Sequence, residues 1–261
     1  MKIGIFDSGL GGLTVLSFLQ KLLPEEEYYY YADSDHVPYG TKTGAQIYEY
    51  SKEAVSFLIN KGCDIVCIAC NTATSVAAEG LRKSFDIPIV GIEPAVKPAV
   101  AGEHKKDERI LVVATPVTVK EKKLHELIDR FDEAKQVDMK ALPELPVFAE
   151  KGIFDGEEIR EYLKKEFADV NVSVYSKVVL GCTHFIHFIN LFREIFNDDV
   201  VFLDGCEGTA NNIYRRATQA GFPGAGAFSI EFYRSGKLVT DDKDLQFFNM
   251  ILERLEKNRI C

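Results

Sequence analysis

Short apolar runs, rich in β-branched and aromatic residues, alternate with longer amphipathic stretches along almost the whole chain. Runs of this kind predict strands, and stretches with apolar residues three or four positions apart predict helices. The predicted strands cover residues 3–6, 28–32, 65–69, 87–91, 110–114, 137–139, 178–180, 200–203 and 227–234. The predicted helices cover residues 13–23, 44–60, 74–85, 117–131, 156–167, 185–196, 209–220 and 243–257. Nearly continuous apolar strands separated by helices are typical of parallel sheets covered on both faces, so the pattern predicts an α/β fold.

The length of 261 residues allows one large domain or two smaller domains with a core each. Pro94, Pro98 and the charged stretch of residues 103–109 indicate a domain junction, and we expect a second crossing near residues 204–208. We therefore predict two similar α/β domains with parallel-rich sheets flanked by helices. The first takes residues 1–96 together with 209–261, and the second takes residues 97–208.

The charge balance narrows the classes of partner. A net charge of −9 argues against a general binder of nucleic acid or of an anionic membrane surface, because both need a basic face. No apolar run is long enough to cross a bilayer, and the chain begins with a predicted strand instead of a leader. The cytoplasm is the expected compartment, where the six cysteines would be mostly reduced thiols.

Polar motifs follow several predicted strands at the point where each strand ends. They are Asp7-Ser8-Gly9, Cys70-Asn71-Thr72, Thr115 and Cys182-Thr183-His184. Ligands of parallel α/β folds bind at the carboxyl ends of the strands, so these residues form the candidate site.

Cys70 and Cys182 take similar places in the two predicted halves, each between a strand and a helix. A helix N-terminus favours the thiolate, so each cysteine is predicted to be a usable base near neutral pH. A thiol from each half suggests a substrate held between two sulfur atoms. That arrangement suits chemistry on both faces of one carbon atom.

Cys63, Cys67 and Cys70 have a spacing that resembles the cluster-binding loop of radical enzymes. Cys67 lies inside an apolar strand, however, so alternation puts Cys67 and Cys70 on opposite faces, and no metal site is expected. Cys63, Cys67, Cys206 and Cys261 are interpreted as small apolar residues.

The turn Asp7-Ser8-Gly9-Leu10-Gly11-Gly12 has three interpretations. It could cradle a phosphate at a helix start, serve only as a turn, or present Asp7 and Ser8 to a substrate. A dinucleotide site is disfavoured because Thr14 replaces the third glycine and Asp7 would repel a pyrophosphate, although Asp33 mimics the ribose ligand of that motif. Presentation of Asp7 and Ser8 is the favoured interpretation.

His184 is the one histidine within a cysteine motif, so it could tune the Cys182 thiol or relay protons. The histidines at 36, 104, 125 and 187 are expected on surfaces or helices. Tyr39 and Gly40 lie on a loop that could contact a ligand, and Glu150 is ambiguous when taken alone.

Together these motifs resemble those of the glutamate racemase family, in order and spacing, from residue 7 to about residue 204. The resemblance implies two α/β domains facing each other across a cleft that holds the active site. It also implies a cofactor-independent and metal-free isomerase that interconverts L- and D-glutamate and supplies D-glutamate for peptidoglycan, and hence for cell wall biogenesis and cell shape.

The resemblance also assigns roles residue by residue. Cys70 and Cys182 would be the two acid/base thiols, with Asp7 assisting Cys70, and Glu150 and His184 assisting Cys182. The substrate's charged groups would be held by residues that include Asp7 and His184 themselves. The remaining binding residues would be Ser8, Tyr39, Gly40, Asn71, Thr72, Thr115, Thr118 and Thr183.

The chain departs from the family pattern at two positions. Ile186 stands where a proline is usual, and Glu121 stands where a serine is frequent, which affects the expected shape of the second half of the pocket. The sequence lacks the N-terminal extension of racemases activated by a cell-wall precursor, so regulation of that type is not expected. A homodimer is an option that the family suggests and that no surface patch in the sequence identifies.

Racemisation needs one base on each face of the α-carbon. Reacting atoms approach within about 3–3.5 Å, so the sulfur atoms should lie roughly 7 Å apart, well beyond a disulfide bond of about 2.0 Å. The site must also stabilise the negative charge that develops on the α-carboxylate, and hydroxyl and N–H groups after Ser8, Asn71 and Thr183 are the candidate donors. A drier cleft strengthens such bonds, so closure of the domains around the ligand is expected.

Other functions stay open at this stage. The substrate could be aspartate or a related acidic amino acid, since a sequence does not measure the length of a pocket. The protein could also be a non-catalytic binder of an acidic amino acid, or a thiol oxidoreductase that forms a reversible Cys70–Cys182 disulfide.

Overall fold

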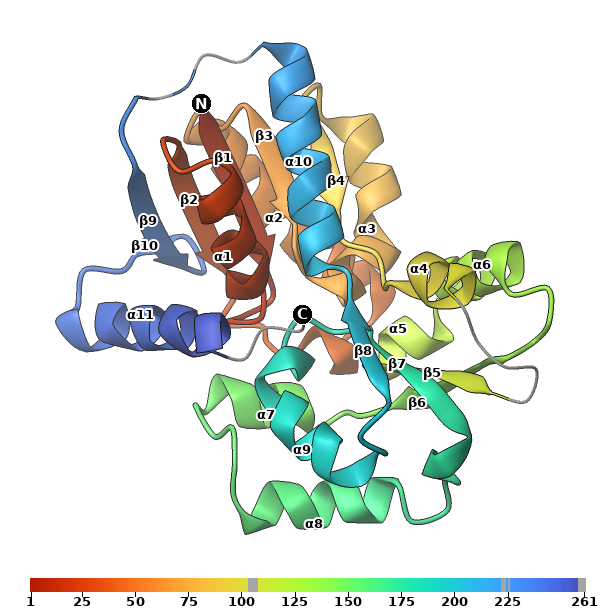
Figure 1. Cartoon of the computed structure of the whole chain (residues 1–261). Coiled ribbons are helices and arrows are strands. Elements are labelled where there is room, and N and C mark those ends of the chain that lie inside the picture. The colour runs from red at the N-terminus through yellow and green to blue at the C-terminus, as the bar shows by residue number, and fades with distance from the viewer. Residues whose placement is uncertain (103–107, 222–223, 225, 258–261) are drawn as a thin grey trace.

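Two parallel-rich sheets organise the chain, and helices cover both (Figure 1). The computed structural model describes residues 1–102, 108–221, 224 and 226–257. The predicted α/β class is confirmed, with a first sheet built from both ends of the chain and a second sheet built from its middle.

The first sheet has the strand order β10-β9-β2-β1-β3-β4. Its strands are β1 (Lys2–Asp7), β2 (Glu27–Ala32), β3 (Ile65–Ile68), β4 (Ile89–Gly91), β9 (Ser229–Arg234) and β10 (Lys237–Leu238). All neighbours are parallel except the β9–β10 hairpin. The central strand β1 is buried almost throughout, as a strand covered on both faces requires.

The second sheet has the order β6-β5-β7-β8 and is parallel throughout. Its strands are β5 (Arg109–Ala114), β6 (Val137–Ala141), β7 (Tyr175–Leu180) and β8 (Val201–Asp204). This order repeats the order β2-β1-β3-β4 of the first sheet. The segments that follow β3 and β7, which carry Cys70 and Cys182, are therefore in equivalent positions.

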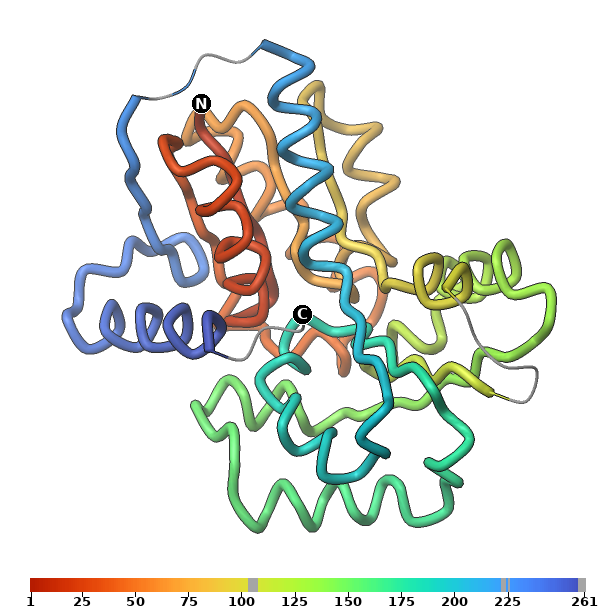
Figure 2. Tube along the Cα trace, in the orientation of Figure 1, coloured from red at the N-terminus to blue at the C-terminus, as the bar shows by residue number. Residues whose placement is uncertain are grey.

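Helices of the first half are α1 (Leu13–Leu22), η1 (Tyr39–Thr41), α2 (Gly44–Asn60), α3 (Asn71–Ser84), α10 (Cys206–Ala220) and α11 (Asp242–Lys257). One face of the first sheet is covered by α1 and α10, which pack together, and the other by α2 and α3 (Figure 1). The chain returns from β8 through α10 to the first sheet, and α11 packs against α1 (Figure 2).

Helices around the second sheet are α4 (Val96–Ala101), α5 (Pro116–Lys120), α6 (Lys122–Phe131), α7 (Leu145–Glu150), α8 (Glu157–Glu166), η2 (Val172–Val174), η3 (Phe185–Phe188) and α9 (Ile189–Ile195). The apolar side chains of α4 and α6 form one core with β5 and β7. On the opposite face, the residues of α7, α8 and α9 join the core of α1, α10 and α11. The two halves therefore share one continuous apolar core.

Several helices differ from the sequence prediction. The helix predicted over residues 117–131 is two helices, because Glu121 adopts an extended backbone that ends α5 and precedes α6. The β-branched run Val117-Thr118-Val119 favours only a short helix there. The helix predicted over 185–196 begins as the 3₁₀ segment η3, and α4, α7, η1 and β10 were not predicted.

The domain boundaries stay a prediction. Each sheet, apart from its loops, falls within one of the two predicted segments, although the boundary at residues 208 and 209 lies inside α10. The charged stretch at 103–107, which includes His104, and Cys261 lie outside the described residues. Among the helices that the structure describes, none combines the length and the hydropathy needed to span a membrane.

Candidate active site

One small cavity lies where the carboxyl ends of the two sheets meet. Cys70 contributes to it from the first half and Cys182 from the second. The other lining residues are Ser8, Val37, Pro38, Tyr39, Gly40, Thr72, Thr115, Pro146 and His184. The cavity leaves ≈ 10 Å³ for the centre of a water molecule, which is room for about one water.

Cys70 caps the N-terminus of α3 and is 5% exposed. Its Sγ accepts a hydrogen bond from the Ala73 N–H at 3.4 Å, and its thiol donates to Ser8 Oγ at 3.4 Å. Burial, followed by the charge of Asp7, raises the pKa of Cys70 to about 12. The prediction that the helix start makes Cys70 a thiolate near neutral pH is therefore wrong, because desolvation outweighs the two weak hydrogen bonds.

Cys182 lies beside a histidine and not at the start of an α-helix, since the short 3₁₀ segment η3 follows it. The helix-dipole argument made for Cys182 is wrong for that reason. Its Sγ is instead 3.7 Å from Nδ1 of His184, and Nε2 of His184 is 2.7 Å from Oε1 of Glu150. The sequence prediction that these three residues lie together agrees with this geometry.

His184 is almost fully buried. Burial alone would lower the pKa of His184, but hydrogen bonds with Cys182 and Glu150, and the charges of both, raise it well above its ordinary value. This shift of the pKa favours the protonated imidazole, whose Nδ1 faces the Cys182 sulfur.

Asp7 links the two halves of the site. Its carboxylate accepts hydrogen bonds from the Gly9 N–H at 2.8 Å and from Thr183 Oγ1 at 3.1 Å. Burial raises the pKa of Asp7, and the charge of His184 opposes that change. Asp7 does not line the cavity, and its charge contributes to the raised pKa of Cys70.

The glycines of the turn after β1 allow the second half to approach closely. A Cβ on Gly9 would lie 1.9 Å from Oε1 of Glu150, and a Cβ on Gly11 would lie 2.4 Å from Oγ1 of Thr183. Oε1 of Glu150 also accepts the Leu10 N–H at 2.7 Å. The place that a phosphate cradle would offer is thus filled by Glu150. Of the two residues that the turn was expected to present, Ser8 lines the cavity and Asp7 does not.

Tyr39 and Gly40 form one wall of the cavity. The Tyr39 hydroxyl donates a hydrogen bond to Oδ2 of Asp33 at 2.6 Å. The Asp33 carboxylate therefore binds a group of the protein itself at the position where a dinucleotide site would bind a ribose. A Cβ on Gly40 would lie 3.0 Å from the Cβ of Thr115.

Three threonine hydroxyls join the halves beside this wall. Oγ1 of Thr72 is 2.9 Å from that of Thr115 and 3.1 Å from that of Thr118, and the last two are 3.1 Å apart. Thr72 and Thr115 line the small cavity that holds Cys70 and Cys182, whereas Thr118 does not line it.

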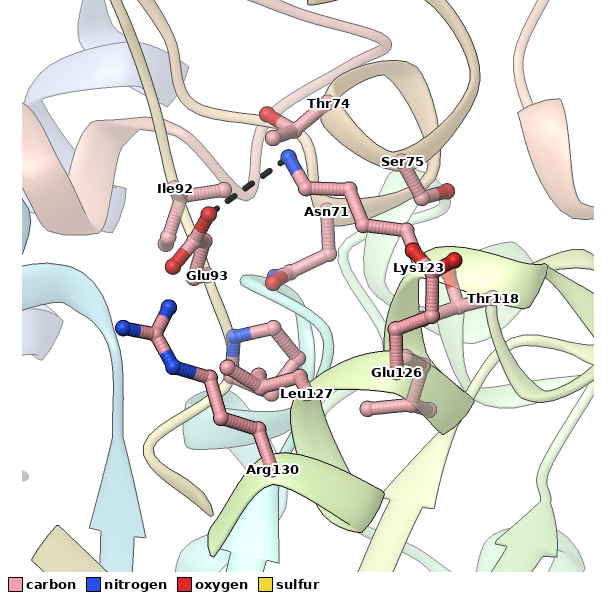
Figure 3. A pocket seen from close by; sticks show the side chains of 12 residues that line it. Asn71, Thr74, Ser75, Ile92, Glu93, Thr118, Lys123, Glu126, Leu127 and Arg130 are labelled. Carbon is pink, nitrogen blue, oxygen red and sulfur yellow. Dashed lines mark ion pairs between the residues drawn. The ribbon is translucent and has the colours of Figure 1, made fainter. Parts of the chain in front are cut away.

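A second, larger cavity of ≈ 220 Å³ lies behind this threonine cluster (Figure 3). Asn71 and Thr118 line it, so these two predicted substrate-binding residues stand at the wall between the cavities and not in the catalytic one. The Asn71 amide points into the second cavity, and its Oδ1 makes no hydrogen bond within the part of the chain that the structure describes. Lys123 and Glu93 also line this cavity and form an ion pair there, with 3.5 Å between Nζ and Oε1.

Sequence reasoning missed Val37 and Pro146 as cavity residues. Pro146 lies at the start of α7, four positions before Glu150. Prediction of this short helix would have placed Pro146 near Glu150, but the sequence analysis did not predict it. Of the two departures from the family pattern, Ile186 is buried within η3 and Glu121 is the extended residue between α5 and α6.

The remaining cysteines are separate from the catalytic cavity. Cys67 belongs to the core of α1 and α10, whereas Cys63 and Cys70 belong to the core of α2 and α3, as the alternation of side chains predicted. All cysteines of the described ranges are free thiols: Cys63, Cys67, Cys70, Cys182 and Cys206. Within those ranges, no group of three or more His, Cys, Asp and Glu residues is arranged to hold a metal ion.

Comparison with known proteins agrees with this architecture. Residues 14–213 match the model of the Asp/Glu/Hydantoin racemase family. The glutamate racemase of Lachnospira eligens is 44% identical over 263 residues, covering 99% of each chain. That of Campylobacter curvus is 46% identical over 261 residues, covering 98% of each chain. The crystal structure of Escherichia coli glutamate racemase in complex with L-glutamate and activator UDP-MurNAc-ala superimposes with a TM-score of 0.80 at 28% identity, covering 97% of this chain and 94% of that one.

The repeated α/β halves with a shared cavity are those of a racemase, a class of isomerase. The chain belongs to the Asp/Glu/Hydantoin racemase family.

Gly9→Ala should destabilise the protein, because the added methyl group displaces Glu150 from its bonds to Leu10 and His184. We expect a loss of about 1–3 kcal/mol in the free energy of unfolding, measured in urea. Gly208→Ala in α10 is the matched control, since a Cβ there meets no atom within 4 Å. An unchanged stability of Gly9→Ala would contradict the close approach.

The raised pKa of Cys70 predicts a pH-dependent stability. A thiol whose pKa is higher in the folded state stabilises that state below the unfolded pKa of about 8.5, and the contribution falls as the pH rises towards 12. Between pH 8.5 and 10, the wild type should lose about 1 kcal/mol per pH unit more than Cys70→Ala, because the unfolded thiol is only half ionised at the start of this range. Urea unfolding of both proteins across this range measures the difference, and parallel curves would contradict a buried neutral thiol.

Proposed function

We propose that this protein is a cofactor-independent glutamate racemase that interconverts L- and D-glutamate with two cysteines. One cysteine removes the α-proton, and the other returns a proton to the opposite face of the same carbon. The observation that carries the proposal is the joint lining of one cavity by Cys70 and Cys182, from equivalent positions after β3 and β7. The names of the relatives and the L-glutamate in the Escherichia coli structure support glutamate as the substrate.

The surroundings of the two thiols assign unequal starting roles. Cys70 keeps its proton at neutral pH, so it is the proton donor of the resting enzyme. Cys182 has the His184 imidazole 3.7 Å from its sulfur and is the group that we assign to remove the α-proton. After one turnover, Cys70 has lost its proton and Cys182 has gained one, and the reverse reaction uses this state.

The substrate's own charges fit the remaining groups. Hydroxyls of Ser8, Thr72 and Thr115 line the cavity and can donate to a carboxylate on which charge develops. Asp7 supplies a negative field that suits the ammonium group. The proposal also includes the supporting roles of three neighbours: Asp7 assists Cys70, and Glu150 and His184 assist Cys182.

Binding requires motion of the two halves. Room for about one water does not hold glutamate, so the halves must separate to admit the substrate and close around it. The closed cavity then excludes water and strengthens the hydrogen bonds to the carboxylates.

The biological setting is a further part of the proposal. We infer that the D-glutamate is supplied for peptidoglycan and hence for cell shape, as the family resemblance implies, and that the protein acts in the cytoplasm. The free thiols of the described residues suit a reducing compartment. The proposal includes the homodimer that the family resemblance suggests.

The test is racemisation by the pure protein in D₂O without added cofactor. Circular dichroism should show loss of optical activity from either enantiomer, and the product formed first should carry solvent deuterium at Cα. Cys70→Ala and Cys182→Ala should each lower kcat by at least about 10³-fold, because one face of the carbon loses its acid or base. Cys63→Ala is the matched control, since that buried thiol lies outside the cavity.

Near-normal turnover in either variant would reject the two-thiol mechanism. Aspartate turned over faster than glutamate would favour the alternative substrate, and calorimetric binding without racemisation would favour a binding protein. A disulfide between the two cysteines under mild oxidant would favour the thiol oxidoreductase.

A further inference from the structure

The C-terminal helix α11 contacts segments that carry site residues of both halves. On the first half, Phe248 of α11 packs against Tyr30 with ring centroids 6.1 Å apart. The Tyr30 hydroxyl in turn donates to the Gly9 carbonyl at 2.7 Å. The turn that carries Asp7 and Ser8 is thus supported from behind by α11 (Figure 2).

On the second half, α11 reaches the segment that carries Glu150. Gly152, which follows α7, approaches Phe247 so closely that a Cβ there would lie 3.1 Å from Cε2 of the ring. Glu150 is two positions away and holds His184. The segment that follows α7 is therefore also in contact with α11.

The third contact is polar. Nη2 of Arg254, in the last turns of α11, donates to the His187 carbonyl at 3.1 Å, and the guanidinium lies 4.8 Å above the centroid of Phe154. His187 belongs to η3, and its N–H donates to the His184 carbonyl at 3.2 Å. Arg254 therefore holds the backbone of the turn that begins at His184.

The chemistry of this contact is unusual for a purely structural one. Arg254 is half-buried, burial lowers its pKa, and its Nε has no hydrogen-bond partner among the residues that the structure describes. A cation in such a place costs stability unless it is well paired, and a methionine would pack on Phe154 without that cost. Groups that are costly for folding are expected where they serve function.

The ring of His187 takes no part in the hydrogen bond with Arg254, which is made by the backbone carbonyl. The ring is 1% exposed, and neither of its nitrogens makes a hydrogen bond within the described ranges. Burial, followed by the charges of His184 and Arg254, lowers its pKa to about 3, so it is neutral. The ring packs 5.0 Å from Phe154, which leaves the backbone carbonyl as the group that Arg254 holds.

We propose that Arg254 is a positioning residue, which ties α11 to η3 and thereby keeps His184 between Cys182 and Glu150. The inference rests on the proposed function for its catalytic consequence, but its structural consequence is independent of it. Because α11 also packs on α1 and behind Tyr30, the tie connects the two halves at the rear of the site.

The test compares Arg254→Met, Arg254→Lys and the control Glu253→Ala, which changes an exposed residue of the same helix. Methionine keeps the length of the stem but cannot donate, whereas lysine keeps one charged donor. We expect at least about a tenfold loss of kcat/KM in Arg254→Met, because His184 is misplaced. Arg254→Lys should recover most of this loss, and Glu253→Ala should match the wild type.

A second readout does not depend on activity. NMR titration of the His184 imidazole, assigned with His184→Gln, reports its contacts with the groups that face it: Cys182, Glu150, Asp7 and His187. In Arg254→Met the pKa of His184 should fall by roughly one pH unit, since its bonds to Cys182 and Glu150 loosen. Loss of a nearby positive charge alone would raise that pKa, so the direction separates positioning from a field effect.

The outcomes are distinct. Wild-type kcat/KM and an unchanged His184 pKa in Arg254→Met would overturn the inference. So would a lower kcat/KM that follows only a lower melting temperature, with an unchanged His184 pKa, because that marks a structural residue. If the wild type does not racemise glutamate, the proposed function fails, while the His184 titration still decides the role of Arg254.

Discussion

The contact between the glycine turn after β1 and the second half of the molecule is the constraint on which the site depends. At Gly9 and Gly11 no side chain separates the halves, and Glu150, Thr183 and His184 occupy the space that a Cβ would take. Each half thereby completes the other: the Leu10 N–H binds Glu150, and Thr183 binds Asp7.

The same closeness governs the electrostatics. Packing the halves together removes water from Cys70, Asp7 and His184, and in that setting a hydrogen bond or a nearby charge decides protonation. Cys70 has only weak hydrogen bonds and the negative charge of Asp7 nearby, so its proton is retained. His184 has hydrogen-bond partners on both ring nitrogens, Cys182 and Glu150, and these raise its pKa against the effect of burial.

The sequence predicts the sheets and the membership of the site well, because both depend on local patterns. Apolar runs located most strands, and polar residues at their ends located Ser8, Cys70, Cys182 and His184. Tyr39 was placed on a loop that could contact a ligand. Prediction from the sequence fails where the outcome depends on tertiary contacts. The thiolate expected at Cys70 is prevented by burial, and Asn71 faces a neighbouring cavity although it follows Cys70 directly. Pro146 and the support from α11 come from segments far apart in sequence, which no local pattern reveals.

The unequal partners of the two sulfur atoms have a kinetic consequence. Mirror-image amino acids have the same free energy in water, so the equilibrium constant of their interconversion is one, whatever the enzyme. The surroundings of the two sulfur atoms are not symmetric. The His184 imidazole lies beside the sulfur of Cys182, and the charge of Asp7 acts on the thiol of Cys70. The maximal velocities and Michaelis constants for the two directions are therefore free to differ, while the ratio of velocity to Michaelis constant must be the same for both.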